Sequence, residues 1–336
     1  MADILGITMG CPVGIGPEII LRFLAAYDGS DFQPVILGDP GVLARCRDEL
    51  GLPGEIVSWQ PGMAIVPGAV NVLPLSDLGR ELSWGKPNAV TGRAMGGYIE
   101  SGVRLVQQGV LAGIVTCPIT KTALNHGGYP YPGHTEMLAD LCGGGDFAMM
   151  LAGERLRVTL VTIHVALAQV VSLLSAEKVA RLIEITGQAL RRDFGIAAPR
   201  LAVAGLNPHA GEAGMFGDEE ERLIVPGIAR AAARGWPAAG PFPPDTVFHQ
   251  AAAGKFDAVV CMYHDQGLIP FKLLHFADGV NVTLGLPIVR TSVDHGTAYD
   301  IAGRGVASPS SLAAAFQLAG EIVVNRRRAG AGDVAA

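Results

Sequence analysis

The chain has 336 residues, of which 49% are hydrophobic and 17% are charged. This length accommodates one large domain or two ordinary ones, and it can bury a core without disulfide or metal support. The 25 basic and 31 acidic residues give a net charge of −6. That charge argues against a nucleic-acid-binding protein, which presents Lys and Arg to the phosphates. The high hydrophobic fraction excludes a largely disordered chain.

Short apolar runs alternate along the chain with longer segments in which apolar residues recur at three- and four-residue spacing. In chain order, the sequence predicts buried strands at residues 4–8, 34–37, 112–116, 156–162, 201–204 and 258–261. It predicts helices at residues 18–26, 90–108, 176–191 and 219–233. This alternation indicates an α/β fold with a mainly parallel sheet.

The sequence also indicates where the protein works. Residues 1–5 contain no basic region that leads into an apolar stretch, so we expect no secretory signal. No run of about 18 apolar residues is present, and we therefore expect no membrane association. The 5 cysteines are scattered and form no CxxC pair. They favour buried thiols in a reducing cytoplasm over a disulfide framework or a thiolate zinc site.

Three histidines each follow the end of a predicted strand: His164, His209 and His264. Ligands bind at the carboxyl ends of parallel strands in open α/β sheets. Three imidazoles that met there would form an open metal site with positions left for substrate oxygens. Imidazole suits zinc, cobalt, nickel or iron, and the neighbouring Asp265 would allow a harder ion. The alternative is that these are ordinary loop histidines, because their spacing matches no local metal signature.

Two segments have the pattern of a turn that leads into a helix. Residues 10–18 (GCPVGIGPE) follow the first predicted strand, but their spacing differs from the GxGxxG dinucleotide fingerprint. A tight strand-to-helix turn and a ligand contact both remain open for this segment. Residues 132–136 (PGHTE) place His134 and Thr135 at the start of a helix, where free N–H groups attract phosphate or carboxylate. An ordinary cap by Thr135 is equally compatible with the pattern.

Several polar residues stand in otherwise apolar surroundings: Lys272, Asn281 and Arg290. A Lys or Arg in an apolar stretch needs either an ion-pair partner or an anionic ligand. The polar residues 292–305 read, by themselves, only as a loop that leads into a short helix.

Taken together, these segments resemble the 4-hydroxythreonine-4-phosphate dehydrogenase family of vitamin B6 biosynthesis. The resemblance extends to about residue 325 and rests on ordered motifs: TMG and GIGPE within 8–18, PGHTE at 132–136, GLNPHAGE at 205–212, YHDQG at 263–267, and NVTLGLP through RTSVDHGTA at 281–298. Residues 295–305 also resemble the HG[ST]AxDIAG segment of isocitrate and isopropylmalate dehydrogenases.

The resemblance implies two α/β domains that flank a deep cleft. Residues 1–125 plus 280–336 would form a discontinuous nucleotide-binding domain, and residues 126–279 a metal-binding and dimerisation domain. It further implies a cytoplasmic homodimer whose active site combines residues of both protomers.

The same resemblance assigns roles to individual residues. It implies that a divalent metal ion (Zn, Mg, Co or Mn) is bound by His164, His209 and His264. It implies that the phosphorylated substrate is contacted by His134, Thr135, Lys272, Asn281 and Arg290. It implies that part of NAD or NADP is held by Asp294, His295, Gly296, Thr297 and Ala298.

The implied reaction is the oxidation of 4-phosphooxy-L-threonine at C3 to a β-keto acid, which decarboxylates to 3-amino-2-oxopropyl phosphate. Lys272 and Asp245 are candidates for the base that takes the hydroxyl proton, and the sequence does not choose between them.

Departures from the family pattern leave the substrate open. Cys11 stands where the family usually has Asp or Glu, and Thr120 stands where Asn is more frequent. His164 is followed by Val165-Ala166-Leu167, where a Pro or Ser is common before the Leu. A paralogue that oxidises threonate or erythronate 4-phosphate, or a dihydrodiol carboxylate, is one alternative. A metal-dependent hydrolase or acyl transferase is an alternative from another class, and it predicts no nicotinamide binding.

Overall fold

The structure is a computed structural model that describes residues 3–29, 32–79 and 82–333. Contacts between Cα atoms divide the chain into two compact units, residues 1–145 with 286–323 and residues 146–285 with 324–336. The expected boundaries assigned 126–145 to the second domain, and 280–285 and 324–336 to the first, whereas the contacts assign these three segments the other way round. The functional roles expected for the two domains stay predictions.

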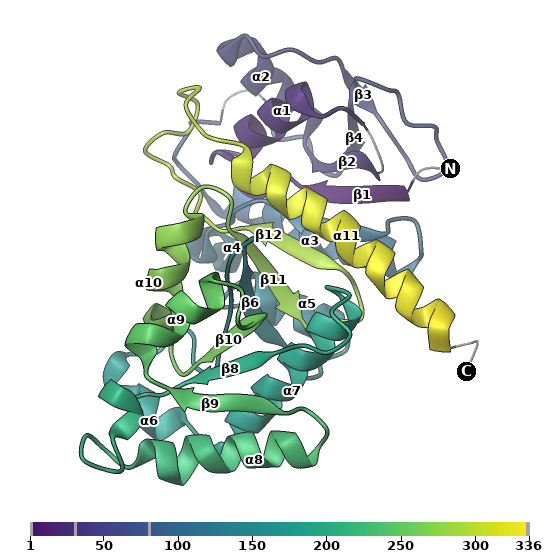
Figure 1. Cartoon of the computed structure of the whole chain (residues 1–336). Helices are drawn as coiled ribbons and strands as arrows, with labels where there is room; N and C mark the ends of the chain where they lie inside the picture. The colour runs from purple at the N-terminus through teal and green to yellow at the C-terminus, as the bar shows by residue number, and fades with distance from the viewer. Residues whose placement is uncertain (1–2, 30–31, 80–81, 334–336) are drawn as a thin grey trace. The chain divides into compact units, whose positions relative to one another are not determined.

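The first unit is built on parallel strands in the order β3-β4-β2-β1-β5-β12 (Figure 1). The strands are β1 (Asp3–Thr8), β2 (Phe32–Gly38), β3 (Ile56–Ser58), β4 (Val70–Pro74), β5 (Gly113–Thr116) and β12 (Arg290–Val293). The helices are α1 (Gly16–Ala26), α2 (Pro40–Leu50), α3 (Ala89–Gln107), α4 (Lys121–His126), α5 (His134–Leu141) and the portion of α11 (Ser310–Asp333) up to residue 323.

The start of α1 shows how the sequence positions the loops of this unit. Pro17 occupies the first turn, where its missing N–H costs no hydrogen bond. A Cβ atom at Gly16 would overlap the carbonyl oxygen of Met9, so the close approach of strand and helix requires glycine. The carboxylate of Glu18 is buried and accepts hydrogen bonds from the N–H groups of Gly305 and Ala307. The loop after β12 is thereby fixed against the first turn of α1.

The second unit has the strand order β11-β6-β7-β10-β8-β9. The strands are β6 (Ala148–Ala152), β7 (Arg157–Leu160), β8 (Leu201–Ala204), β9 (Ala238–Phe242), β10 (Ala258–Cys261) and β11 (Val280–Leu284). The helical segments are η1 (Leu167–Gln169), α6 (Val170–Leu173), α7 (Ala176–Arg192), η2 (Pro208–Gly211), η3 (Glu220–Ile224), α8 (Val225–Ala233), α9 (Pro244–Ala252) and α10 (His264–His275). Strands β7, β10, β8 and β9 are parallel, whereas β6 is antiparallel to both β11 and β7.

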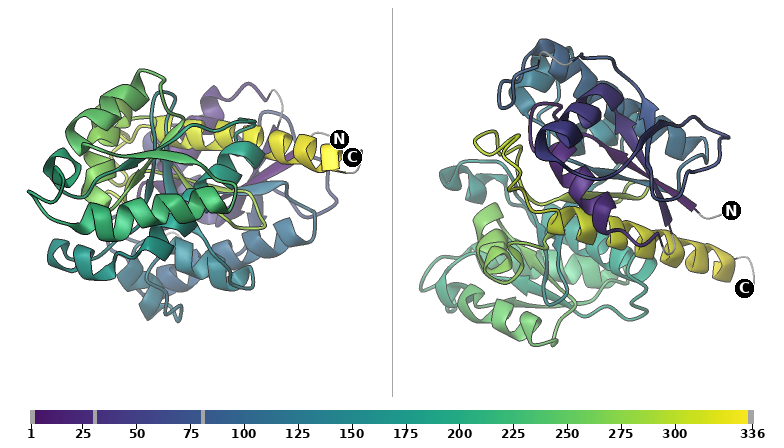
Figure 2. Two further views of the ribbon diagram at one scale, coloured as in Figure 1. Left: turned by 60° about the horizontal axis from the view of Figure 1, so that its bottom comes forward. Right: turned by 90° about the horizontal axis from the view of Figure 1, so that it is seen from above.

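Helices cover both faces of this second sheet, as the two views of Figure 2 show in teal and green. Val158 and Leu160 belong to a core cluster that also contains Val247 of α9 and Phe271 of α10. Thr159, which lies between them in β7, is hydrogen-bonded to Thr186 of α7. Since neighbouring residues of a strand point to opposite faces, α7 lies on the face opposite to α9 and α10.

The predicted α/β fold class is confirmed. The predicted strands at 201–204 and 258–261 coincide with β8 and β10, and the predicted helix at 176–191 coincides with α7 to within one residue. The predicted helix at 219–233 is observed as two consecutive segments, the π-helix η3 and the α-helix α8. Among the described residues, no helix combines the length and the apolar character needed to cross a membrane.

An ion-pair network forms around a buried carboxylate at the C-terminal end of α7. Asp193 is 1% exposed and is paired with Arg192 at 2.7 Å and with Arg326 of α11 at 2.8 Å. Burial by itself raises the pKa of Asp193, but the hydrogen bonds from the two guanidinium groups hold it below its ordinary value of 3.8. The ionised form is therefore the one that folding favours.

We expect Asp193→Asn to lower the free energy of unfolding by about 2–4 kcal/mol at neutral pH, because two arginines lose a buried anionic partner. The contribution of Asp193 is complete above its unfolded-state pKa and is lost as the pH falls through the lower folded-state pKa. The variant should therefore differ less from the wild type at acid pH. Denaturant unfolding at both pH values measures this.

The control is Asp218→Asn. Asp218 is 59% exposed and pairs with Arg222, also largely exposed, so this change should alter the stability by less than about 0.5 kcal/mol. An equal loss in the two variants would contradict the role given to Asp193.

Candidate functional site

The three predicted metal-binding histidines follow three neighbouring parallel strands of the second unit. Strand β10 lies between β7 and β8. His164 follows β7, His264 follows β10 and His209 follows β8. The ring centres of His164 and His264 are 5.6 Å apart. With an imidazole nitrogen about 2.1 Å from a metal ion, two rings that ligate the same ion have centres about 5–6 Å apart, so this pair fits joint ligation.

A carboxylate orients one of these two rings. Nδ1 of His264 lies 2.7 Å from Oδ1 of Asp265. Metal-binding histidines typically donate their second ring N–H to a carboxylate, which fixes the tautomer and raises the basicity of the other nitrogen. In this arrangement, Nε2 of His264 is the nitrogen left for a ligand.

The loop that carries His209 has a strained backbone. Positive φ angles occur at His209 (53°), Ala210 (54°), Glu212 (43°) and Ala213 (52°). For residues with a Cβ atom, the left-handed conformation costs roughly 1–2 kcal/mol per residue. Such strain persists only where the surrounding structure over-determines it, and it concentrates at functional sites.

The carboxylate that holds this loop comes from the π-helix η3. Glu220 is 3% exposed. One of its oxygens accepts hydrogen bonds from the backbone N–H groups of Leu206 and Asn207, each at 2.7 Å. Its other oxygen accepts from the side-chain amide of Asn207 at 2.9 Å. Single turns of π-helix are frequent at functional sites because they redirect a side chain.

The described part of the chain contains no group of three or more His, Cys, Asp or Glu side chains arranged to hold a metal ion. The single chain therefore brings His164 and His264 together without assembling the full predicted set of three. The donor chemistry suits a divalent metal ion, and ligation by all three histidines stays a prediction.

The two candidate bases lie on helices that pack around these loops. Asp245 is exposed in the first turn of α9, and α9 packs against η2, which contains His209. Lys272 lies on α10, two turns after His264, with its ammonium group 5.7 Å from the centre of the Phe276 ring. The predicted substrate residue Asn281 is half-buried in β11.

In the first unit, helix α5 begins at His134, with Thr135 as its second residue, as predicted. Nε2 of His134 is buried and has no hydrogen-bond partner among the described residues. Burial, and then the nearby charge of Arg290, hold the pKa of His134 well below its ordinary value of 6.5. The imidazole is therefore neutral and has an unsatisfied nitrogen.

Arg290 is the first residue of β12 and is 3% exposed. Its guanidinium group donates to Oγ1 of Thr116 from Nη2 at 2.7 Å and from Nε at 3.2 Å. Burial lowers the pKa of Arg290 to about 9. A desolvated guanidinium close to an unsatisfied imidazole suits the binding of an anionic group such as phosphate.

The predicted nucleotide loop, residues 294–298, lies against the turn between β1 and α1. The carbonyl oxygen of Thr297 accepts from the N–H of Ile15 at 3.1 Å. Just beyond the loop, the hydroxyl of Tyr299 donates to Sγ of Cys11 at 3.3 Å. Ala298 has a positive φ of 42°. These contacts hold the loop in a defined shape, and binding of NAD or NADP by Asp294, His295, Gly296, Thr297 and Ala298 stays a prediction.

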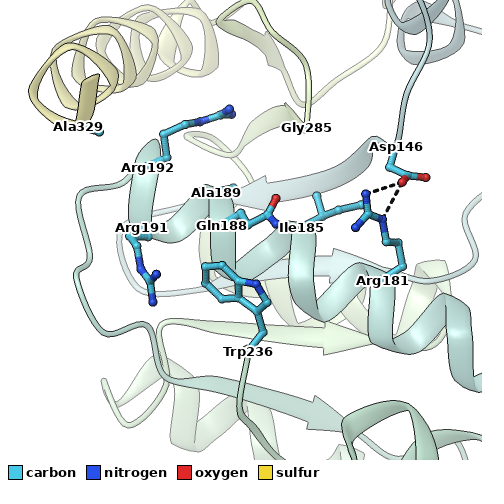
Figure 3. Close-up of a pocket in the computed structure, with 10 residues that line it drawn as sticks. All are labelled: Asp146, Arg181, Ile185, Gln188, Ala189, Arg191, Arg192, Trp236, Gly285 and Ala329. Atoms are coloured by element: carbon cyan, nitrogen blue, oxygen red, sulfur yellow. Dashed lines mark hydrogen bonds and ion pairs between the residues drawn. The ribbon is translucent and has the colours of Figure 1, made fainter. Parts of the chain in front are cut away.

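A pocket of about 600 Å³ lies elsewhere in the second unit, beside α7 (Figure 3). Arg181 in this pocket is hydrogen-bonded to Asp146, and Arg191 stacks 4.6 Å from the centre of the Trp236 ring. None of the predicted site residues lines it. We therefore place the candidate site at the histidine loops and not in this pocket.

Three residues next to the predicted site were missed by the sequence analysis: Thr116, Glu220 and Gln266. Thr116 ends a predicted strand and carries no charge that would draw attention. Glu220 acts on a loop more than ten residues earlier in the chain, which no local pattern reveals. A signal did exist for Gln266, which stands two residues after His264 in the YHDQG motif.

Comparisons with known proteins support the same family as the motifs. The chain matches the family model described as pyridoxal phosphate biosynthetic protein PdxA over residues 30–319. It is 55% identical over 321 residues to a 4-hydroxythreonine-4-phosphate dehydrogenase of Desulfosudis oleivorans, with 94% of this chain and 95% of that protein covered.

Solved structures give the same result. A 4-hydroxythreonine-4-phosphate dehydrogenase from Klebsiella pneumoniae has a TM-score of 0.88 and 43% identity, covering 96% of this chain and 98% of that one. A terephthalate 1,2-cis-dihydrodiol dehydrogenase from Burkholderia xenovorans has a TM-score of 0.64 and 30% identity, with 96% and 98% covered. The resemblance found in the sequence motifs is confirmed, and the chain belongs to the PdxA family of pyridoxal phosphate biosynthetic proteins.

Proposed function

We propose that this protein is an NAD(P)- and divalent-metal-dependent dehydrogenase that oxidises the C3 hydroxyl of 4-phosphooxy-L-threonine. The resulting β-keto acid loses carbon dioxide to give 3-amino-2-oxopropyl phosphate, a step of pyridoxal phosphate biosynthesis. The observation that carries this proposal is the pair of imidazoles of His164 and His264 at the ends of neighbouring strands. Relatives named 4-hydroxythreonine-4-phosphate dehydrogenase, at 55% and 43% identity, support this substrate.

In this proposal, His164, His209 and His264 hold the metal ion, and residues 294–298 hold part of the nucleotide. When bound, the metal ion supplies Lewis-acid stabilisation of the developing alkoxide, and NAD(P) supplies the hydride acceptor. Asp265 orients the ring of His264. The protein thereby fixes the reacting groups in place before the reaction starts.

The phosphorylated substrate presents anionic groups, and the proposed substrate residues match them. Arg290 supplies a desolvated cation, and His134 supplies a buried nitrogen that needs a partner. Thr135, Lys272 and Asn281 add further polar contacts in this assignment. Because the guanidinium group of Arg290 is shielded from water, an anion bound next to it gains a stronger electrostatic interaction than it would at the surface.

The hydroxyl proton needs an acceptor within hydrogen-bonding reach, and Lys272 and Asp245 remain the two candidates. After hydride transfer, the new ketone accepts the electron pair of the bond to the carboxylate as carbon dioxide leaves. The protein then has to hold the phosphate end of the product while this bond breaks.

We also propose that the enzyme is a homodimer whose active site combines residues of both protomers. Large apolar side chains are exposed just after each of the three histidines. They include Leu167 and Val171 after His164, Met215 and Phe216 after His209, and Ile269, Leu273 and Phe276 after His264. Ile269 and Leu273 on α10 and Phe276 directly after it recur at helical spacing. Exposed apolar surfaces of this kind mark protein interfaces. A second copy that covered them would bring its own residues to the histidine loops.

A cytoplasmic location is the remaining part of the proposal. All five cysteines are free thiols, and four of them are buried. Burial raises the pKa of Cys261 and of Cys117, so these thiols are unreactive. This use of cysteine suits a reducing compartment.

The second candidate function is the oxidation of a related substrate, since the dihydrodiol dehydrogenase from Burkholderia xenovorans shares the fold at 30% identity. Purified protein should oxidise 4-phosphooxy-L-threonine with NAD or NADP, and it should do so with a higher kcat/KM than threonate or erythronate 4-phosphate. Nucleotide reduction followed by absorbance measures this. Turnover of a sugar-acid phosphate alone would transfer the assignment to the paralogue.

His209→Ala should lower kcat by at least about 100-fold, because loss of a metal ligand removes the Lewis acid. The content of divalent metal should fall with it while the far-UV circular dichroism stays unchanged. His249→Ala, an exposed histidine of α9 outside the site, is the control and should keep both activity and metal. Full activity and metal content in His209→Ala would refute the assignment of this residue.

Leu273→Asp should convert the protein to a monomer and abolish turnover, because Leu273 is 82% exposed on α10 and a charge there opposes burial in an interface. Val90→Asp is the matched control, since Val90 is 60% exposed in the first unit. Light scattering gives the mass in solution. A Leu273→Asp protein with the mass and the activity of the wild type would rule out this face as the interface.

A further inference from the structure

The three loops that carry the histidines are joined by a continuous chain of hydrogen bonds. Oγ1 of Thr162 donates to the carbonyl oxygen of Met262 at 2.8 Å. The N–H of Met262 donates to Oε1 of Gln266 at 2.7 Å, and Nε2 of Gln266 donates to the carbonyl oxygen of Gly205 at 2.6 Å. Thr162 lies two residues before His164, Met262 two residues before His264, and Gly205 four residues before His209.

Gln266 spans the point at which the backbone ladder between β8 and β10 stops. The last registered pair of these strands is Val203 with Val260. On the other side of β10, backbone bonds continue past the strand ends, since the N–H of Val161 donates to Cys261 and the N–H of Thr162 to Met262. Beyond the ladder, the side chain of Gln266 is hydrogen-bonded both to the backbone before His209 and to the backbone before His264.

The chemistry of the connection requires an amide. The amide oxygen of Gln266 accepts from a backbone N–H and its amide nitrogen donates to a backbone carbonyl, so one amide group supplies both the acceptor and the donor. The side chain is 7% exposed, so neither bond competes with bulk water. A carboxylate of the same shape keeps the bond to Met262 and loses the bond to Gly205.

The His209 loop is held at its base from two sides. Gln266 binds the carbonyl oxygen of Gly205, and Glu220 binds the N–H groups of the next two residues. The strained left-handed residues begin at His209, one residue beyond this anchored segment. Only Pro208 lies between the anchored residue Asn207 and His209. A rotation of the anchored peptides would therefore move the His209 ring.

We infer that Gln266 is a positioning residue that sets the His209 loop relative to the His264 loop, through one side chain bonded to both. This inference rests on the proposed function where metal binding is concerned, whereas the hydrogen bonds that connect the loops are made between protein atoms alone. Residues that orient metal ligands without touching the metal typically change its affinity by about 10–100-fold when mutated.

The first test uses Gln266→Met in the full-length protein, because methionine has a similar length and can neither donate nor accept these hydrogen bonds. Amide hydrogen exchange in the metal-free protein should become faster at Met262 and over residues 205–211. Titration with Co²⁺, followed by its visible absorption, should show an affinity about 10–100-fold lower than that of the wild type. Gln188→Met on α7, exposed and outside the chain of bonds, is the control and should change neither reading.

A second variant, Gln266→Glu, keeps the proposal testable if the methionine variant does not fold. It retains the acceptor for Met262 and loses the donor to Gly205. Exchange should therefore become faster over 205–211 and stay slow at Met262. Wild-type exchange and Co²⁺ affinity in the folded Gln266 variants would overturn the inference. If His209→Ala binds Co²⁺ as tightly as the wild type, the metal site fails instead, and the exchange pattern still decides the role of Gln266.

Discussion

The candidate site depends on one constraint, the placement of β10 between two parallel neighbours. Parallel strands end at the same edge of a sheet, so the loops after β7, β10 and β8 leave side by side. Each strand is fully buried apart from Arg157 at the start of β7, so their register is fixed by the core and not by the loops. The hydrophobic core thus determines where three histidines that are 45 and 55 residues apart can approach one another.

The histidine loops differ in how much of their shape the backbone supplies. The His164 loop continues the hydrogen-bond pattern of β7 and β10 past the strand ends. The His209 loop instead adopts left-handed conformations that its residues disfavour, and it needs buried side chains of Glu220 and Gln266 to hold them. A buried carboxylate is costly unless it is fully hydrogen-bonded, and Glu220 is bonded through both oxygens. The strain at His209 is therefore offset by hydrogen bonds to the backbone of residues 205–207, which precede it in the chain.

The sequence predicts those parts of this fold that have a local cause. Strands β8 and β10 are short, continuous apolar runs, and α7 has a clear apolar face, so pattern alone finds them. Strand β6 (AMMLA) was missed because alanine and methionine suit a helix equally well, and α10 was missed because Pro270 interrupts its pattern. The start of α5 at His134 followed from its turn residues. Glu220 could not be found, because it binds backbone groups 13 and 14 residues earlier in the chain. Gln266 stands in the YHDQG motif, but its bond to Gly205, 61 residues away, leaves no local pattern.

The incomplete metal set and the exposed apolar residues have a common explanation in the proposed homodimer. Within the described residues, His164 and His264 approach each other, but no three donors form a group. The segments after these histidines expose side chains such as Leu167, Phe216 and Leu273 to water, at a free-energy cost of roughly 25 cal/mol for each Å² of apolar surface. Burying that surface against a second copy would stabilise the assembly at the loops that carry the donors. Assembly and completion of the metal site would then be a single event, and the isolated chain would remain inactive.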